Sequence, residues 1–304
     1  MVQPETLQHA ANAPSAPIIA VIPAFNEERF IASVVLKARR YVDHVLVVDD
    51  GSQDETAWLA EAAGAEVIRQ PNGGKAAALN NGLAAAQARN AAAVVLLDGD
   101  GQHNPNDIPR LLEPIQRGAA DLVVGSRFMG LPSNTPRWRI VGQHALTALT
   151  NVASGVPLSD SQSGFRALSR RALSLMNFTS RGFSVESEMQ FLLRQHNLQA
   201  LEVPISVHYD EKLKRNPVAH GLQVLTGILR LVGQHRPLFF FGVTGAVAIL
   251  VGLALGASVV STYNMYSSLA LGTALIAVTL CIIGVFAIFT GIILHTIRAY
   301  MSER

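Results

Sequence analysis

Two long uncharged stretches near the C-terminus place the strongest constraint on this chain. They run from Leu238 to Val260 and from Ser268 to Leu294, and neither contains a charged residue. About 20 consecutive apolar residues suffice to cross the hydrocarbon core of a bilayer as an α-helix. A soluble core seldom contains two uniformly apolar, glycine-containing segments of this length. The sequence therefore predicts a two-helix transmembrane hairpin over 237–297, followed by a short tail at 298–304.

Basic residues on both sides of this hairpin predict its orientation. Positive charges near membrane spans favour the cytoplasmic side, and the link between the two spans carries no charge. We therefore expect a cell-membrane protein with two spans, whose N-terminal domain and both termini are cytoplasmic. Apolar residues at helical spacing over 218–236 predict an amphipathic interface helix that leads into the first span. The basic residues concerned are Lys212, Lys214, Arg215, Arg230, Arg236, Arg298 and Arg304.

The chain before the hairpin has the pattern of an α/β domain. Residues 1–16 are rich in Ala, Pro, Gln and Asn and are expected to be a disordered lead-in. From 17 to 217, short apolar runs alternate with segments of helical periodicity, which favours a doubly wound, mostly parallel sheet. Pro204 in the last run indicates an edge strand. Strands are expected at 17–23, 44–50, 65–69, 93–97, 121–127, 201–207 and directly after a polar loop at 160–166.

Two helices of this domain carry more specific expectations. Asn26 stands where it would cap a helix that follows the first strand, with acidic residues in the first turn. The segment 131–155 is predicted to be helical, and its apolar side could belong to the core or lie on a membrane surface. Periodicity alone does not decide between these two locations.

Composition excludes several classes of protein. The net charge is +2, charged residues make up 15% of the 304 positions, and no basic stripe interleaved with aromatic residues occurs, so no nucleic-acid partner is expected. The single cysteine, Cys281, allows neither a disulfide framework nor a zinc site of Cys and His. No P-loop and no Gly-x-Gly-x-x-Gly after the first strand occur, which disfavours ATPase and dinucleotide redox functions.

Acidic residues instead follow three of the predicted parallel strands. Glu27, Asp50 and the pair Asp98/Asp100 lie at strand carboxyl ends, where open α/β sheets bind ligands. Two carboxylates one residue apart repel each other unless a cation stands between them, and oxygen ligands suit Mg²⁺ or Mn²⁺. Taken alone, Asp98-Gly99-Asp100 could also be a polar turn without an ion.

Seven motifs occur in order along the chain, at residues 23–28, 47–52, 73–79, 98–103, 124–128, 160–166 and 182–188. Together they indicate a resemblance to a known family. The chain resembles inverting glycosyltransferases of family 2, which have the GT-A fold, and in particular polyprenyl- and dolichyl-phosphate sugar synthases with a C-terminal membrane hairpin. The resemblance implies transfer of a hexosyl group from a nucleotide sugar, GDP-mannose or a UDP-hexose, to dolichyl or undecaprenyl phosphate, with Mg²⁺ or Mn²⁺ as cofactor.

The same resemblance implies roles for individual residues. Asp98, Asp100 and Gln102 match the metal and diphosphate motif, and Asp100, Arg127 and Asp160 match catalytic positions. Asp160 could equally serve the structure of its loop, and Glu186 and Glu188 could contact sugar hydroxyls or simply begin a helix. Nucleotide contacts are expected from Pro23, Phe25, Glu27, Val48, Asp50, Lys75, Asp98 and Gly99, and contacts to the acceptor phosphate from Arg127, Arg139, Lys214 and Arg215.

The chain departs from the family pattern in two places. Gly99 stands where Ala is usual, and 212–217 replaces a more usual Ser-Lys loop.

Two other functions stay open. A polysaccharide synthase of this fold predicts a Gln-x-x-Arg-Trp motif and further spans, whereas the alternative from another class is a non-catalytic membrane scaffold that partners a transferase or a flippase.

A lipid phosphate acceptor would remove the need for a general base. Its second pKa lies near 6, so it is largely dianionic at neutral pH. Arg and Lys side chains would then need only to align it for in-line attack on the anomeric carbon.

Overall fold

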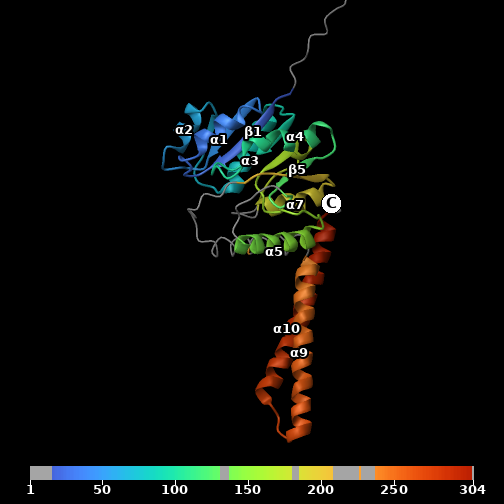
Figure 1. The fold of residues 1–304 in the computed structure, drawn as a ribbon. Coiled ribbons are helices and arrows are strands. Elements are labelled where there is room, and N and C mark those ends of the chain that lie inside the picture. The colour runs from blue at the N-terminus through green and yellow to red at the C-terminus, as the bar shows by residue number, and fades with distance from the viewer. Residues whose placement is uncertain (1–15, 131–136, 180–184, 208–225, 227–236, 303–304) are drawn as a thin grey trace, which may run out of the picture. The chain divides into compact units, whose positions relative to one another are not determined.

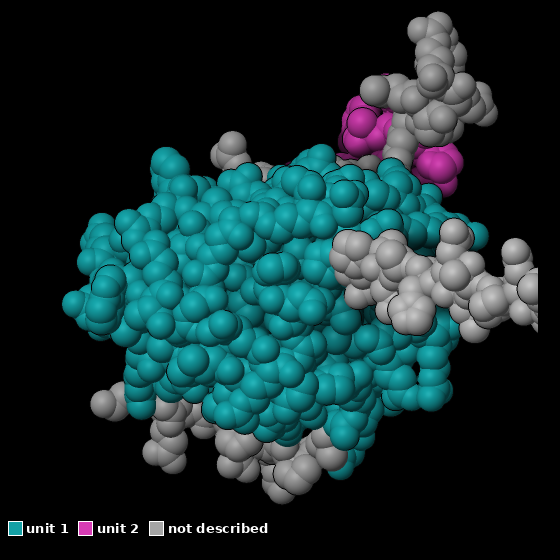
Figure 2. Space-filling model, turned by 90° about the horizontal axis from the view of Figure 1, so that it is seen from above, with its two compact units in different colours: residues 1–224 teal, residues 225–304 magenta. Residues whose placement is uncertain are grey.

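The computed structural model describes residues 16–130, 137–179, 185–207, 226 and 237–302. The chain divides into two compact units, Met1–Val224 and Leu225–Arg304, which are coloured teal and magenta in Figure 2. Unit 1 contains the α/β domain and unit 2 contains two long helices (Figure 1).

Unit 1 is built on a seven-stranded sheet with the order β3-β2-β1-β4-β6-β5-β7. Only β6 runs antiparallel to its neighbours, β4 and β5, so the expected doubly wound, mostly parallel sheet is confirmed. Pro204 ends β7, which is an edge strand as predicted. The strands are β1 (Ile18–Ala24), β2 (His44–Asp49), β3 (Glu66–Arg69), β4 (Ala93–Leu96), β5 (Leu122–Ser126), β6 (Arg166–Ser169) and β7 (Ala200–Pro204).

Helices cover both faces of this sheet and create two apolar cores. Alternate residues of β1 show the division, because Ala20 and Ile22 face one core while Ile19 and Val21 face the other. The first core contains α1 (Ile31–Ala38), α2 (Thr56–Ala62) and α4 (Ile108–Gln116), which follows a 3₁₀ turn, Pro105–Asp107. The second contains α3 (Lys75–Ala88), α6 (Arg170–Leu173) and α7 (Val185–Gln195).

The alanine-rich helix α3 packs close to the sheet at Gly82. Alanine is the best helix former and leaves little side chain between a helix and its support. At Gly82 even a Cβ would lie 2.3 Å from Val21 Cγ1. This close approach fixes α3, and with it Lys75 at its first position, against the central strands.

The expectation that Asn26 caps the first helix is wrong. Phe30 is the N-cap residue of α1, and no acidic residue lies in the first turn. Asn26 has a φ of 55°, a left-handed conformation that Asn tolerates better than most residues. Its side-chain oxygen accepts a hydrogen bond from Gln53 N at 2.9 Å, and its own N–H donates to Ser52 Oγ at 2.9 Å. Asn26 therefore joins the loops after β1 and β2.

Helix α5 (Arg137–Ser154) buries polar as well as apolar side chains. Its most buried side chains include the polar Thr147 and Thr150, which are 4% and 0% exposed. Its apolar Val141 and Val152 are 70% and 56% exposed. Ser161 N–H donates to Thr147 Oγ1 at 3.3 Å, so hydrogen bonds hold the polar face inward. The alternative that the apolar side of this helix belongs to the core is therefore wrong for Val141, whereas Ile140, Leu146 and Leu149 are half-buried.

Unit 2 is a helical hairpin of α9 (Pro237–Tyr266) and α10 (Leu271–Ser302). Both helices are long and apolar enough to cross a membrane. They pack through glycines, because a Cβ at Gly245 would lie 2.5 Å from Gly284 O. The interface helix expected over 218–236 lies outside the described residues, apart from Thr226.

Candidate active site

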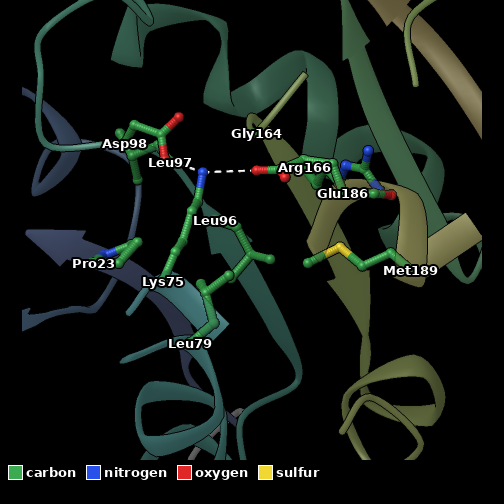
Figure 3. Close-up of a pocket in the computed structure, with 10 residues that line it drawn as sticks. All are labelled: Pro23, Lys75, Leu79, Leu96, Leu97, Asp98, Gly164, Arg166, Glu186 and Met189. Carbon is green, nitrogen blue, oxygen red and sulfur yellow. Dashed lines mark hydrogen bonds and ion pairs between the residues drawn. The ribbon is translucent and has the colours of Figure 1, made fainter. Parts of the chain in front are cut away.

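The carboxyl ends of the central strands bring acidic residues and a lysine together. Lys75 Nζ lies 2.6 Å from Asp98 Oδ1, directly beyond β4, and 2.7 Å from Glu186 Oε1 in the first turn of α7. Figure 3 shows the ammonium group between the two carboxylates, above a wall of Leu79, Leu96 and Met189. Burial alone would lower the pKa of Lys75, but the two negative charges outweigh it and hold the pKa above its usual value.

Asp98 and Asp100 differ in electrostatic environment although they are one residue apart. Burial would raise the pKa of Asp98, yet the positive charge of Lys75 holds it below its usual value. Burial and the negative charges of Asp98 and Glu27 raise the pKa of Asp100 to about 6. Gln102 binds both oxygens of Asp100, through N at 3.0 Å and Nε2 at 2.7 Å. Asp100 is thus the less stable of the two anions.

His103 packs against Phe165 and accepts a hydrogen bond from the backbone of Asp98, at the start of the turn that contains Asp100. Its ring stacks on Phe165 with 5.2 Å between centroids, and its Nδ1 accepts a hydrogen bond from Asp98 N at 3.4 Å. Burial lowers the pKa of His103 to about 4, so the imidazole is neutral at physiological pH. A β-bridge from His103 to Val207 joins the turn to the segment after β7.

Asp50 fixes the loop that leads into α3. Its carboxylate accepts hydrogen bonds from Gly73 N at 2.8 Å, Gly74 N at 2.9 Å and Gln70 Nε2 at 2.7 Å. Gly74 has a φ of 84° and is the N-cap residue of α3, a conformation that glycine adopts without strain. Asp50 therefore sets the position of Lys75, the first residue of that helix.

Arg127 and Asp160 form a buried two-point ion pair. Arg127 Nε and Nη2 donate to Asp160 Oδ2 and Oδ1 at 2.6 and 2.7 Å, and the side chains are 8% and 0% exposed. Glu202 on β7 holds the other side of the loop, where it accepts hydrogen bonds from Ser159 N at 2.7 Å and Asp160 N at 3.1 Å. The pair lies close enough to Asp98 for the charge of Arg127 to contribute to lowering the pKa of Asp98.

Two residues of the 163–166 motif have roles that the sequence did not reveal. Arg166 is fully buried and donates to the carbonyls of Ser161, Ser163 and Glu186 at 2.8, 2.9 and 3.0 Å. It thereby ties the loop to the start of α7. At Gly164 a Cβ would lie 2.7 Å from Asp98 Oδ2, so a side chain at this position would have to displace the Asp98 carboxylate. The motif itself was the only sequence signal for either residue.

The remaining predicted nucleotide contacts differ in accessibility. Pro23 lines the pocket with Lys75 and Asp98, and Phe25 is 37% exposed. Val48 is 0% exposed within the core beneath α3, so its side chain is not available to a nucleotide in this conformation. A Cβ at Gly99 would face Ile31 Cδ1 at 3.3 Å, so this position points into the other core.

The other predicted sugar and phosphate contacts are only partly described. Glu188 accepts hydrogen bonds from Thr179 N at 2.8 Å and Thr179 Oγ1 at 2.9 Å. Arg139 lies on α5, but its side chain is outside the described part of the structure, as are Lys214 and Arg215 entirely.

The two carboxylates after β4, Asp98 and Asp100, fit a divalent ion whose other ligands come from a bound substrate and water. Among the described residues, no group of three or more His, Cys, Asp or Glu side chains is arranged to hold a metal. Mg²⁺ is commonly bound through one or two carboxylates together with substrate phosphates and water. Asp98 and Asp100 can supply such a pair, and the repulsion that raises the pKa of Asp100 is what a cation would relieve.

Solved structures define the class to which this fold belongs. Glucosyl-3-phosphoglycerate synthase from Mycobacterium tuberculosis, in complex with Mg²⁺ and uridine diphosphate, is similar with a TM-score of 0.59 and 26% sequence identity. The similarity covers 72% of this chain and 80% of that one. Unit 1 is therefore a GT-A-like glycosyltransferase fold.

Sequence comparison then identifies the family. The model of glycosyl transferase family 2 matches residues 19–175, about half of the chain, and this chain belongs to that family. It is 32% identical to UDP-N-acetylglucosamine–dolichyl-phosphate N-acetylglucosaminyltransferase of Methanococcus voltae, over 69% of this chain and 91% of the relative. It is 30% identical to polyprenol monophosphomannose synthase of Mycolicibacterium smegmatis, over 64% and 78%. The resemblance drawn from the motifs is confirmed, and the chain is a glycosyltransferase.

Proposed function

We propose that this chain transfers a hexosyl group from a nucleotide sugar to a polyprenyl phosphate, with inversion at the anomeric carbon. The observation that carries the proposal is the union, in one chain, of a family 2 catalytic unit with two helices long and apolar enough to cross a membrane. An acceptor that is itself a membrane lipid accounts for both parts. Two relatives whose names specify dolichyl-phosphate or polyprenol acceptors support it.

The surface of α5 gives independent support for contact with lipid. Its exposed positions include Val141, Ala145, Ala148 and Val152, which recur at helical spacing and carry no charge. An apolar stripe on the outside of a domain, with threonines turned inward, is costly in water and favourable at a bilayer surface. We infer that this stripe rests on the membrane that holds the acceptor.

Donor binding is assigned to the crevice at the ends of β1, β2 and β4. Asp98, Asp100 and Gln102 would hold Mg²⁺ or Mn²⁺ on the diphosphate. When bound, that ion would neutralise the charge that develops on the leaving nucleoside diphosphate. We assign Pro23, Phe25, Glu27 and Asp50 to the nucleotide and Glu186 and Glu188 to the sugar, and Lys75 lies between the two subsites.

Acceptor binding is assigned to the basic residues. Arg127 would align the lipid phosphate for in-line attack on the anomeric carbon, with help from Arg139, Lys214 and Arg215. The phosphate needs no proton removed, because it is largely dianionic at neutral pH. We therefore assign Asp160 the task of holding Arg127, to which it is bonded at two points, rather than that of a base.

A donor screen tests the proposed reaction. Membranes that contain the protein are incubated with undecaprenyl or dolichyl phosphate and with labelled GDP-mannose, UDP-glucose or UDP-N-acetylglucosamine, with and without Mn²⁺. We expect a labelled glycolipid from one donor, lost with EDTA and in Asp100→Ala but kept in Glu113→Ala, which changes an exposed acid on α4. The proposal would be wrong if no donor gave metal-dependent product, or if Asp100→Ala kept full activity.

Labelling of single cysteines tests the proposed topology. In a Cys281→Ser background, one cysteine is placed at Ser267 in the hairpin link and another at Lys37 on the exposed side of α1. A membrane-impermeant maleimide should label the first in intact cells and the second only after lysis. The reverse pattern would place the catalytic unit outside the cytoplasm.

A further inference from the structure

Lys75 forms an ion pair with Asp98, a residue that we assign to the divalent ion. Its Nζ is 2.6 Å from Asp98 Oδ1 and 2.7 Å from Glu186 Oε1, so one ammonium group serves two carboxylates (Figure 3). The Lys75 side chain is only 20% exposed, and those of Asp98 and Glu186 are 29% and 9% exposed. Dissolved salt screens such a partly buried cluster weakly. In this conformation the positive charge beside Asp98 is therefore the ammonium group of Lys75.

The neighbours of Lys75 and Asp98 hold this ion pair together. The lack of a side chain at Gly164 makes room for the pair, since a Cβ there would lie 2.7 Å from Asp98 Oδ2 and 3.2 Å from Lys75 Nζ. The base of Lys75 is also fixed, because Asp50 binds Gly73 N and Gly74 N directly before it. A divalent ion that bound Asp98 through Oδ1 together with Asp100 would therefore have to displace the ammonium group from that oxygen.

Charge determines when this exchange is favourable. A divalent ion and an ammonium group that share one carboxylate repel each other, and the repulsion is strong in a partly buried site. A nucleoside diphosphate brings anionic oxygens that can bind both cations at once. The exchange should therefore be unfavourable for the ion alone and favourable for the ion together with the nucleotide.

We propose that Lys75 is a placeholder cation that couples binding of the divalent ion to binding of the nucleotide. In the ligand-free site it neutralises Asp98 and keeps a lone ion out. When a nucleoside diphosphate enters, Lys75 releases Asp98 and keeps Glu186 as its partner. The coupling is reciprocal, so the ion strengthens nucleotide binding by the same factor. This inference rests on the proposed function, which assigns the ion to Asp98 and Asp100.

Binding of Mn²⁺ to the full-length protein in detergent, followed by the electron paramagnetic resonance signal of the free ion, tests the coupling. Titrations are made without nucleotide and with UDP or GDP. We expect the wild type to bind Mn²⁺ at least tenfold more weakly without a nucleotide than with one. Lys75→Met and Lys75→Gln should bind Mn²⁺ alone at least tenfold more tightly than the wild type. Lys75→Arg, which keeps the cation, and Lys37→Met, which removes an exposed lysine, should match the wild type.

The outcomes separate the inference from the function on which it rests. If Lys75→Met also carries Asp100→Asn, the gain in Mn²⁺ affinity should disappear, because the ion would lose one of its two carboxylates. Equal affinity of the wild type, Lys75→Met and Lys75→Gln for Mn²⁺ alone, with normal binding in the presence of UDP or GDP, would overturn the placeholder role and leave the proposed function intact. No Mn²⁺ binding under any condition would instead refute the assigned metal site.

Discussion

Removal of Asp160 should destabilise unit 1 far more than removal of an exposed acid. Asp160 is 0% exposed and binds Arg127 at two points, at 2.6 and 2.7 Å. Loss of one partner of a buried ion pair leaves an uncompensated charge and costs about 3–5 kcal/mol. For a unit of this size, about 1 kcal/mol shifts the melting temperature by roughly 2–4 °C. Asp160→Ala should therefore lower it by roughly 6–20 °C.

Glu113 supplies a matched control on the same unit. Its pair with Arg117 has a comparable distance, 2.7 Å, but the side chains are 55% and 74% exposed. Such a pair contributes only about 0.3–0.5 kcal/mol, so Glu113→Ala should shift the melting temperature by at most about 2 °C. Tryptophan fluorescence suits the measurement, because both tryptophans, Trp58 and Trp138, belong to unit 1. Equal shifts for Asp160→Ala and Glu113→Ala would refute the reasoning.

The same pair allows the assigned role of Asp160 to be tested apart from stability. Arg127→Ala combined with Asp160→Ala should cost less than the sum of the single changes, because the second change removes the charge that the first left unpaired. Asp160→Asn should lower kcat while leaving the shape of its pH dependence unchanged, since a dianionic acceptor needs no base. Additive stability changes, or loss of one limb of the pH profile in Asp160→Asn, would identify a different role.

Further predictions concern the turn after β4. Asp100 ionises near 3.8 when unfolded and at about 6 when folded, so without metal the stability should fall as pH rises between these values. Asp100→Asn should abolish that fall, as thermal melts in EDTA from pH 4 to 8 would show, and a persisting fall would point to other groups. Mn²⁺ affinity should decrease below about pH 6, and an affinity that stays constant to pH 5 would contradict this. Gly164→Ala should abolish glycolipid synthesis, because its Cβ would lie 2.7 Å from Asp98 Oδ2 and would displace that carboxylate. Gly99→Ala should stay active, because the nearest atom to its Cβ lies 3.3 Å away. Equal activity of the two variants would refute this role of Gly164.

Local sequence pattern accounts for most of the fold. Apolar runs, helical periodicity and Pro204 are local signals, and the sheet, its edge and both long C-terminal helices follow from them. The pattern misplaced Asn26 because capping preference describes an isolated helix start. In this chain the loop after β2 supplies a competing partner, Gln53 N, and the residue turns to meet it.

The polarity of α5 could not be derived from periodicity for a related reason. Periodicity shows that a helix has two faces but does not show which face meets the protein. Thr147 and Thr150 turn inward because polar partners lie beneath them, Ser161 in the loop before β6 and Ser187 on α7, both within hydrogen-bonding distance. That loop comes to α5 only through the tertiary fold, so the outward position of Val141 and Val152 is a property of the assembled unit.

Sequence motifs located the site but did not show how its groups are paired. Lys75 and Glu186 are 111 positions apart, and Arg127 and Asp160 are 33 apart, so neither pairing leaves a local signal. Arg166 escaped prediction because a buried arginine bonded to three backbone carbonyls resembles any other arginine in a sequence. The fold alone determines which of these groups meet.

These pairings change how the affinity of the site should be understood. In this structure, Asp98 is bonded to Lys75, Asp100 to Gln102, Arg127 to Asp160, and Asp50 to the amides of Gly73 and Gly74. Each of these four groups thus already has a partner, which avoids the cost of a buried polar group left unsatisfied. Where a ligand replaces such a partner, binding is an exchange, and its affinity measures the difference between two bonded states. A mutation that weakens the internal partner can therefore tighten ligand binding while it destabilises the fold.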